Sequence, residues 1–301
     1  MKKKIVLMLT VIMLIGLAGC GKNQINIKET GTSDNNEQMV QNIYENKRTE
    51  VKQKISEIKE RLPETSAEDK GTCGSKAKWY YKDNTLIIYG EGVITEDTWH
   101  KSNIVINTVV IDSGITKLGN NMFSGLGSEV GKNIENFYIA DGLEEIGSST
   151  FVNCDCLSEI VLPPSLYFID GYTFASCDSL KNVYMTDGVE KIGDSAFTGC
   201  KSLDSIFIPK TVLAIGNGVF TGCNNLSDIQ ISKDNRIFSE KNNCIINNDT
   251  KTLIYAINKD FSIPDDILCI AEDAIYGCEI DSLVIPEGVK EIEERAFTYS
   301  K

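Results

Sequence analysis

The sequence predicts a β-rich solenoid of stacked short repeats, preceded by a segment that directs export. Three observations lead to this fold class. The chain repeats itself from Val109 to its last residue, four of its cysteines recur every 23 residues, and its first 20 residues combine lysines, an apolar run and a cysteine. Self-similarity at a fixed period of 20 to 50 residues is the usual sign of a repeat architecture.

The repeat is defined by residue types that return at fixed positions. Apolar residues stand at the start of each segment and two, six and nine positions later. The segments start at Val109, Phe137, Ile160, Val183, Ile206, Phe261 and Leu283. A large apolar side chain also returns fourteen positions after each start, at Phe123, Phe151, Phe174, Phe197, Phe220, Ile275 and Phe297. Agreement of seven segments at five positions indicates one structural unit used repeatedly.

The spacing within a segment predicts its local structure. Positions zero and two lie on one face of a short strand, because strand side chains alternate, and short helical or 3-10 turns complete the rung. About five apolar side chains per rung contribute ~2 kcal/mol each, against ~1.5 kcal/mol of ordering cost per residue. One rung therefore cannot fold alone, and stacked rungs form the folding unit. We expect this solenoid over residues 109–301, interrupted at about 229–260 by a hairpin that emerges from the stack.

The cysteines follow the repeat. One structural column has the same place in successive segments and comprises Cys154, Cys177, Cys200, Cys223 and Cys278. Free cysteine is small, apolar and readily buried, so we expect this column to be reduced and structural. Export would also permit disulfides. Besides Cys20, four cysteines lie off the column, and the sequence leaves their pairing open: Cys73, Cys156, Cys244 and Cys269.

The N-terminus reads as an export signal. Three lysines precede an apolar stretch from Ile5 to Leu17, which is too short to span ~30 Å of hydrocarbon. The following Leu17-Ala18-Gly19-Cys20 resembles the lipobox of bacterial lipoproteins, which implies a signal peptide over residues 1–19 and a lipid on Cys20. An ordinary signal peptide cut elsewhere is the alternative. Cleavage of the signal peptide removes its three lysines and takes the formal charge from −13 to −16. So acidic a chain is not expected to bind nucleic acid.

Residues 20–70 are expected to form a lipidated tether and a helical stalk. Asp34 and Glu37 make a capping box, and Pro63 ends the pattern. Between them one apolar stripe comprises Val40, Tyr44, Val51, Ile55, Ile58 and Leu62. A helix of about 29 residues is roughly 43 Å long, enough to hold a domain off a membrane. The stripe also leaves open self-association as a short coiled coil, or a half-formed helix.

Residues 71–108 are expected to cap the first rung. Trp79-Tyr80-Tyr81 and the run from Leu86 to Tyr89 flank Lys82-Asp83-Asn84, which predicts a β-hairpin. A solenoid needs such a cap because its first rung exposes an apolar face. No cap follows the last repeat, so we expect an open final rung, and whether Lys301 is the natural end stays undecided.

Segments such as Ile206-Phe207-Ile208-Pro209 and Ala196-Phe197-Thr198-Gly199-Cys200 closely resemble the BspA-like leucine-rich repeats of bacterial surface proteins. The resemblance covers Val109 to Lys301, and the Gly71-Thr72-Cys73-Gly74 segment is similar to one that precedes such repeats in Gram-positive anaerobes. It implies a curved, right-handed leucine-rich-repeat solenoid that binds proteins or mediates adhesion, lipid-anchored on the outer face of a Gram-positive cell. It implies no particular ligand.

Groups suited to catalysis are few. His100 is the single histidine, which excludes multi-histidine zinc sites. Cys154-Asp155-Cys156 lacks the spacing of a redox pair, and the acid pairs Glu144-Glu145 and Asp265-Asp266 lie where a solvated face is expected. We therefore expect no catalytic site, no metal site and no cofactor.

The expected function is that of a lipid-anchored, non-enzymatic binding or adhesion protein with a protein partner. Alternatives are a glycan or cell-wall ligand and a structural spacer in an envelope assembly. The candidate binding ridge is the outward-facing column one position after each segment start: Val110, Tyr138, Val161, Tyr184 and Phe207. Contiguous exposed apolar surface marks interaction sites, although strands also favour such residues for support along a ladder.

Overall fold

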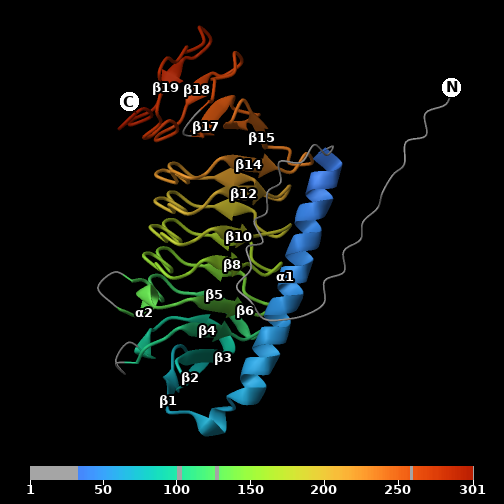
Figure 1. Ribbon diagram of the computed structural model, residues 1–301, viewed down its shortest axis with the longest axis vertical. Coiled ribbons are helices and arrows are strands. Elements are labelled where there is room, and N and C mark those ends of the chain that lie inside the picture. Colours follow the sequence, from blue (N-terminus) through green and yellow to red (C-terminus); the bar gives the residue numbers. More distant parts are fainter. Residues whose placement is uncertain (1–32, 100–103, 126–128, 258–259, 301) are drawn as a thin grey trace, which may run out of the picture.

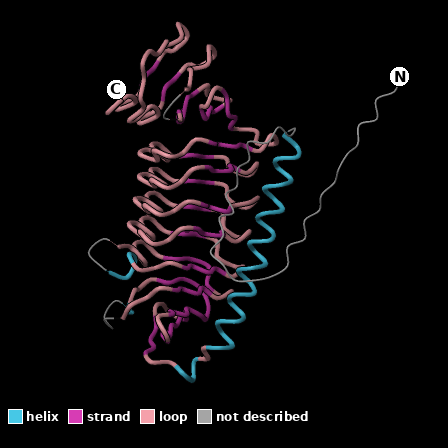
Figure 2. Tube along the Cα trace, viewed as in Figure 1, coloured by secondary structure: helices cyan, strands magenta, loops and turns pink. Residues whose placement is uncertain are grey.

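The computed structural model describes residues 33–99, 104–125, 129–257 and 260–300. Its backbone winds into stacked turns, with one long helix beside them (Figure 1). The strands are short and loops connect them within each turn (Figure 2). The predicted β-rich leucine-rich-repeat solenoid is thus confirmed.

The N-terminal cap is an antiparallel sheet of β1 (Asp69–Thr72), β2 (Lys76–Lys82) and β3 (Thr85–Ile94). The β2–β3 hairpin turns at Asp83 and Asn84, whose φ angles of 48° and 55° lie in the left-handed region that Asp and Asn tolerate. β3 then pairs in parallel with β4 and β5. The cap therefore supplies the strand edge on which the first rung forms.

Each rung contributes to two parallel ladders. The first ladder comprises β4 (Thr108–Ile111), β6 (Asn136–Ile139), β8 (Glu159–Val161), β10 (Asn182–Tyr184), β12 (Ser205–Ile208) and β14 (Asp228–Ile231), which pair as β4–β6, β8–β10 and β12–β14. The second comprises β5 (Ile115–Leu118), β7 (Glu145–Ile146), β9 (Phe168–Ile169), β11 (Lys191–Ile192) and β13 (Ala214–Ile215). A Cβ on Gly193, which follows β11, would lie 2.5 Å from the backbone nitrogen of Gly171. Neighbouring rungs can approach this closely only because glycine occupies the turn.

The core between the ladders contains a stack of aromatic rings. Phe123, Phe151, Phe174, Phe197 and Phe220 are fully buried, and successive ring centroids lie 6.0, 5.1, 5.3 and 5.7 Å apart. Next to them the structure places the column cysteines, whose thiols donate hydrogen bonds to the carbonyl of an earlier rung, as from Cys177 to Phe151 at 2.9 Å. No two of the nine cysteines in the described residues form a disulfide.

The solenoid changes after β14. β15 (Phe238–Lys241), β16 (Cys244–Asn247) and β17 (Thr252–Ala256) are antiparallel, and β17 continues in parallel to β18 (Cys269–Ile270) and β19 (Glu291–Ile292). The expected hairpin is thus present as β16–β17. The expectation that it emerges from the stack is wrong, because β17 is a member of the continuing ladder and Tyr255 is buried against Phe220. The repeat pattern also extends further than expected, since β14 pairs with β12 in register.

Helix α1 (Ser33–Arg61) has the predicted length, but its prediction as a free stalk is wrong. It runs along the solenoid from the cap to the level of β14 (Figure 1) and packs against the first ladder. A short 3-10 helix, η1 (Glu64–Ser66), joins it to β1, and the other helix of the described chain, α2 (Glu129–Lys132), is one turn long. Neither α1 nor α2 is long and apolar enough to cross a membrane. The Asp34 side chain of the predicted capping box lies outside what the structure describes.

Candidate functional site

The outward side of the first ladder, which we call the strand face, carries the candidate binding ridge. Strand register places Val110 beside Tyr138, Val161 beside Tyr184, and Phe207 beside Gln230. Gln230 extends the column onto β14, which sequence reasoning missed. The signal was present, because Ile229 stands 23 residues after Ile206.

Helix α1 covers much of this face with its apolar stripe. Tyr44, Val51, Ile55, Ile58 and Leu62 are buried in one cluster with side chains of the cap and the strand face. Burial of an aliphatic side chain of this size contributes about 1.5–3 kcal/mol. The apolar stripe that suggested a coiled coil therefore packs against the cap and the strand face of the same chain.

The ridge is consequently not an exposed surface along its whole length. Val110 has no exposed surface and Val161 is 5% exposed. Tyr138 and Tyr184 are half-buried beside α1, and burial raises the pKa of both hydroxyls. The expectation that period-two alternation turns these residues to solvent is wrong for Val110 and Val161, because α1 takes the place of solvent.

Polar contacts fix the position of α1 on the strands. The Arg48 side chain is 4% exposed, donates to the Ile139 carbonyl at 3.0 Å, and pairs with Asp141 at 2.6 Å. Burial raises the pKa of Asp141, but hydrogen bonds from Lys52 and Arg48 outweigh it and leave that pKa below its usual value. The Tyr44 hydroxyl donates to the Leu162 carbonyl at 2.8 Å. Carbonyls at the ends of two neighbouring strands are thus satisfied by helix side chains.

Further contacts define both ends of the helix. Glu37 accepts a hydrogen bond from the Ser232 hydroxyl at 2.5 Å, just after β14, and Gln41 accepts one from Thr186 at 3.0 Å. At the other end Lys59 pairs with Asp112 at 2.5 Å, just after β4. Helix α1 therefore spans the strand face from β14 back to the cap.

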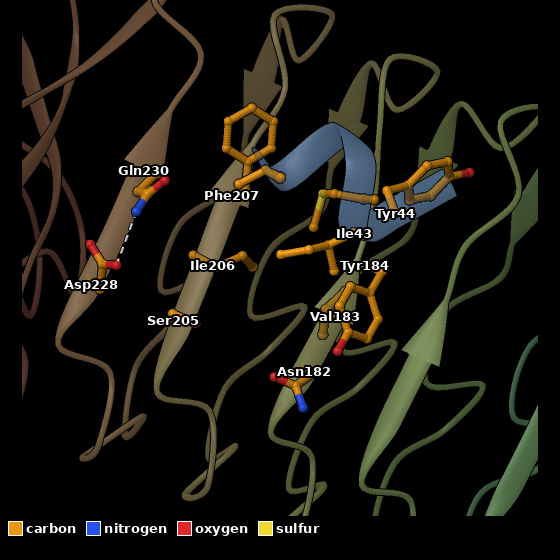
Figure 3. A pocket seen from close by; sticks show the side chains of 12 residues that line it. Ile43, Tyr44, Asn182, Val183, Tyr184, Ser205, Ile206, Phe207, Asp228 and Gln230 are labelled. Carbon is orange, nitrogen blue, oxygen red and sulfur yellow. Dashed lines mark hydrogen bonds between the residues drawn. The ribbon is translucent and has the colours of Figure 1, made fainter. Parts of the chain in front are cut away.

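The packing becomes open near the start of α1. Val40, Ile43 and Tyr44 approach β10, β12 and β14, and a cavity of about 50 Å³ lies between them and the strands. Figure 3 shows Ile43 on the helix opposite Val183, Ile206 and Phe207. The cavity is mainly apolar, with Asp228 and Gln230 at its β14 side, where the Gln230 amide donates to Asp228 at 3.1 Å.

A larger groove continues from this cavity and shares Phe207, Asp228 and Gln230 with it. It has a volume of about 630 Å³, within the usual range of ligand sites. One wall is the start of α1 with Asn36 and Glu37. The far wall comprises Ser239, Glu240 and Asn248 of the β15–β16 region. This groove is a part of the strand face that α1 leaves accessible, and a smaller opening of about 260 Å³ lies beside the middle of α1 at Tyr138, Glu159 and Val161.

The remaining predicted site residues do not converge. Cys20, proposed for lipidation, and His100 lie outside the described residues. Cys154 is buried while Cys156 is exposed. Of the acid pairs, Glu145 pairs with Lys117, and Asp266 pairs with Lys241 of β15 and with Lys251, which precedes β17. In the described ranges no group of three or more Cys, His, Asp or Glu side chains is placed to hold a metal ion.

A family model described as BspA type leucine rich repeat region matches residues 129–251 and 254–301 in six copies. The chain belongs to this BspA-type leucine-rich-repeat family. No curated protein matches the chain.

Solved structures of similar fold are bacterial leucine-rich-repeat proteins. One from Eubacterium ventriosum has a TM-score of 0.68 at 21% identity; the alignment covers 77% of this BspA-type chain and 64% of that one, less than two thirds of its length. The pneumococcal vaccine antigen PcpA has a TM-score of 0.57 at 16% identity, covering 75% and 66% of the two chains. A leucine rich cell surface protein from Faecalibacterium prausnitzii has a TM-score of 0.55 at 21% identity, covering 77% and 74%. At these identities the likeness concerns the fold alone.

Proposed function

We propose that the chain is a non-enzymatic cell-surface protein that binds a protein partner through the groove at the β12–β14 end of the strand face. One observation carries the proposal. Helix α1 packs on the strand face from the cap to β10, where an opening of about 260 Å³ remains, and leaves the larger groove of about 630 Å³ with Phe207 and Gln230 accessible beyond it. Aromatic side chains, phenylalanine among them, are enriched in protein–protein interfaces.

The groove lining is suited to recognition. It presents amide, hydroxyl and carboxylate groups around Phe207. Such convergent polar groups next to apolar surface give orientation and specificity to a bound ligand. Membership of a family with cell-surface relatives of the same fold supports the location.

We propose attachment to the membrane through lipid on Cys20. Ser33 begins α1 thirteen residues after Cys20, and the following turn of the helix contacts Ser232 beside β14. A chain of that length reaches at most about 47 Å when fully extended. In this arrangement the groove end of the solenoid is the end nearest the anchor.

Affinity capture with the full chain in mild detergent tests the function. Phe207→Ser should lose proteins that the unmodified chain retains from bacterial and host surface fractions. Leu213→Ser is the matched control, since this side chain is 58% exposed and does not line the groove. Equal retention by both variants would place the ligand elsewhere. A triple Ser variant of Tyr138, Tyr184 and Phe207 is less informative, because the two tyrosines also pack near α1.

The same assay separates the alternative functions. Loss of retained material after protease treatment of the fractions supports a protein partner. Loss after periodate oxidation alone identifies a glycan or cell-wall ligand instead. If the unmodified chain retains nothing from any fraction, a structural spacer is the better account.

A further inference from the structure

Strand β14 ends a ladder. The Ser232 amide donates to the Ile208 carbonyl of the preceding rung at 2.9 Å. The backbone N–H and C=O groups of Asp228 and Gln230 therefore also point toward β12. In parallel strands the intervening residues, Ile229 and Ile231, turn their N–H and C=O groups to the opposite side. Among the described strands, β12 is the one with which β14 pairs. An unpaired strand edge is a template for a further strand.

The groove borders this edge. Residues 228–233 all line it, so it follows the whole strand. The next strand, β15, lies beside β14 but pairs with β16 and not with β14. An extended segment laid along β14 would therefore have Ser239 and Asn248 on its other side.

The adjoining cavity favours an aliphatic anchor. Its volume of about 50 Å³ lies under Val40 and Ile43 and beside Phe207. A cavity that binds benzene has about 150 Å³, so this one is too small for an aromatic ring. The end of a leucine, isoleucine or methionine side chain is the better fit.

The charges around the groove favour a basic ligand. Glu37, Asp228 and Glu240 line it, with Lys233 as the lysine among the described lining residues. These carboxylates accept hydrogen bonds from the Ser232 hydroxyl, the Gln230 amide and the Asn243 backbone, respectively. The whole chain is acidic as well, with a formal charge of −13. Complementary charge steers association and selects partners.

We infer that the groove binds an extended, basic peptide segment of a partner protein, which adds to β14 as a strand and inserts one aliphatic side chain beside Phe207. This inference rests on the proposed function and specifies its partner. Strand addition gives affinity through main-chain hydrogen bonds and specificity through alternate side chains. The acidic groove then selects lysine or arginine near the aliphatic anchor.

Selection from a display library of random linear peptides tests the inference, with the full chain in mild detergent as bait. We expect enriched peptides to contain an aliphatic residue with Lys or Arg nearby and to bind in extended form. N-methylation of alternate residues in the best peptide should abolish binding, because it removes backbone donors. Phe207→Ser should weaken binding about 30-fold, the equivalent of a hot spot of ~2 kcal/mol.

Matched variants separate charge from folding. Glu240→Gln should weaken binding severalfold and reduce its dependence on salt, while Glu144→Gln, an exposed change outside the groove, should alter neither. Acidic consensus peptides, peptides with a helical pattern, or full binding by the N-methylated peptide would overturn the inference. Failure to enrich any peptide, while Phe207→Ser still abolishes capture of a protein, would overturn it and leave the proposed function intact.

Discussion

Replacement of Phe197 by alanine tests whether the aromatic stack holds successive rungs together. Its ring is fully buried between Phe174 at 5.3 Å and Phe220 at 5.7 Å. Loss of a buried phenylalanine side chain costs about 3–5 kcal/mol through lost burial and the cavity that remains. Each ring contact contributes about 0.5–1.5 kcal/mol of this beyond area burial.

Urea unfolding of the full chain measures the cost. Phe197→Ala should lower the free energy of unfolding by about 3–5 kcal/mol. Phe197→Leu keeps most of the apolar volume and removes two stacked contacts, so about 1–3 kcal/mol is expected. A loss below about 1 kcal/mol for Phe197→Ala would refute the reasoning, because surface substitutions cost that little.

Three further predictions concern single side chains. Cys177→Ala should cost about 1–2 kcal/mol by urea unfolding, since it removes a buried thiol; a disulfide at Cys177, found by mass spectrometry without reduction, would contradict its structural role. The pKa of Asp141 is lowered in the folded chain, so its contribution is present above the unfolded pKa of about 3.9 and lost as pH falls through the folded value. Asp141→Asn should therefore destabilise the chain at neutral pH and have little effect in strong acid, whereas an equal loss at both would contradict the ion pair with Arg48. Cys20→Ala should prevent metabolic labelling with a fatty-acid analogue; label that persists on this variant would exclude Cys20 as the attachment point.

The solenoid could be predicted from sequence because each rung is determined locally. Phe151, Phe174 and Phe197 recur at one position, and all three are fully buried in the core of their rungs. The same reasoning predicted the β2–β3 hairpin, since Asp83 and Asn84 suit a left-handed turn. Because the same residue pattern occurs in each repeat, the fold of one rung can be predicted without knowledge of long-range contacts.

The placement of α1 could not be predicted in this way. An apolar stripe such as Val51 and Ile55 shows that one side of a helix is buried, but does not show against what. The surface that buries this stripe is the outward column of the strands with Val110 and Val161. The helix stripe and the strand column are both apolar because they pack against each other. The contact of Arg48 with the Ile139 carbonyl had no sequence signal, because a backbone acceptor carries no residue identity.

The groove was missed for a related reason. Its residues come from α1, β12, β14 and the β15–β16 region, which are separated by up to about two hundred positions in sequence. The sequence predicts Phe207 as a member of the ridge but not Asp228 and Gln230, because the predicted interruption of the repeat begins at about residue 229. The 23-residue spacing from Ile206 would have extended the repeat.

Hydrogen exchange on the full chain tests most directly whether α1 is a fixed cover of the strand face that leaves the β14 groove open. Isolated helices of this kind fray and exchange rapidly, whereas elements of a cooperative core exchange only on larger opening. The account predicts that the amides from Tyr44 to Leu62 exchange as slowly as those of β6 and β8. Rapid exchange throughout α1, with the solenoid strands still protected, would show a free stalk and contradict the account.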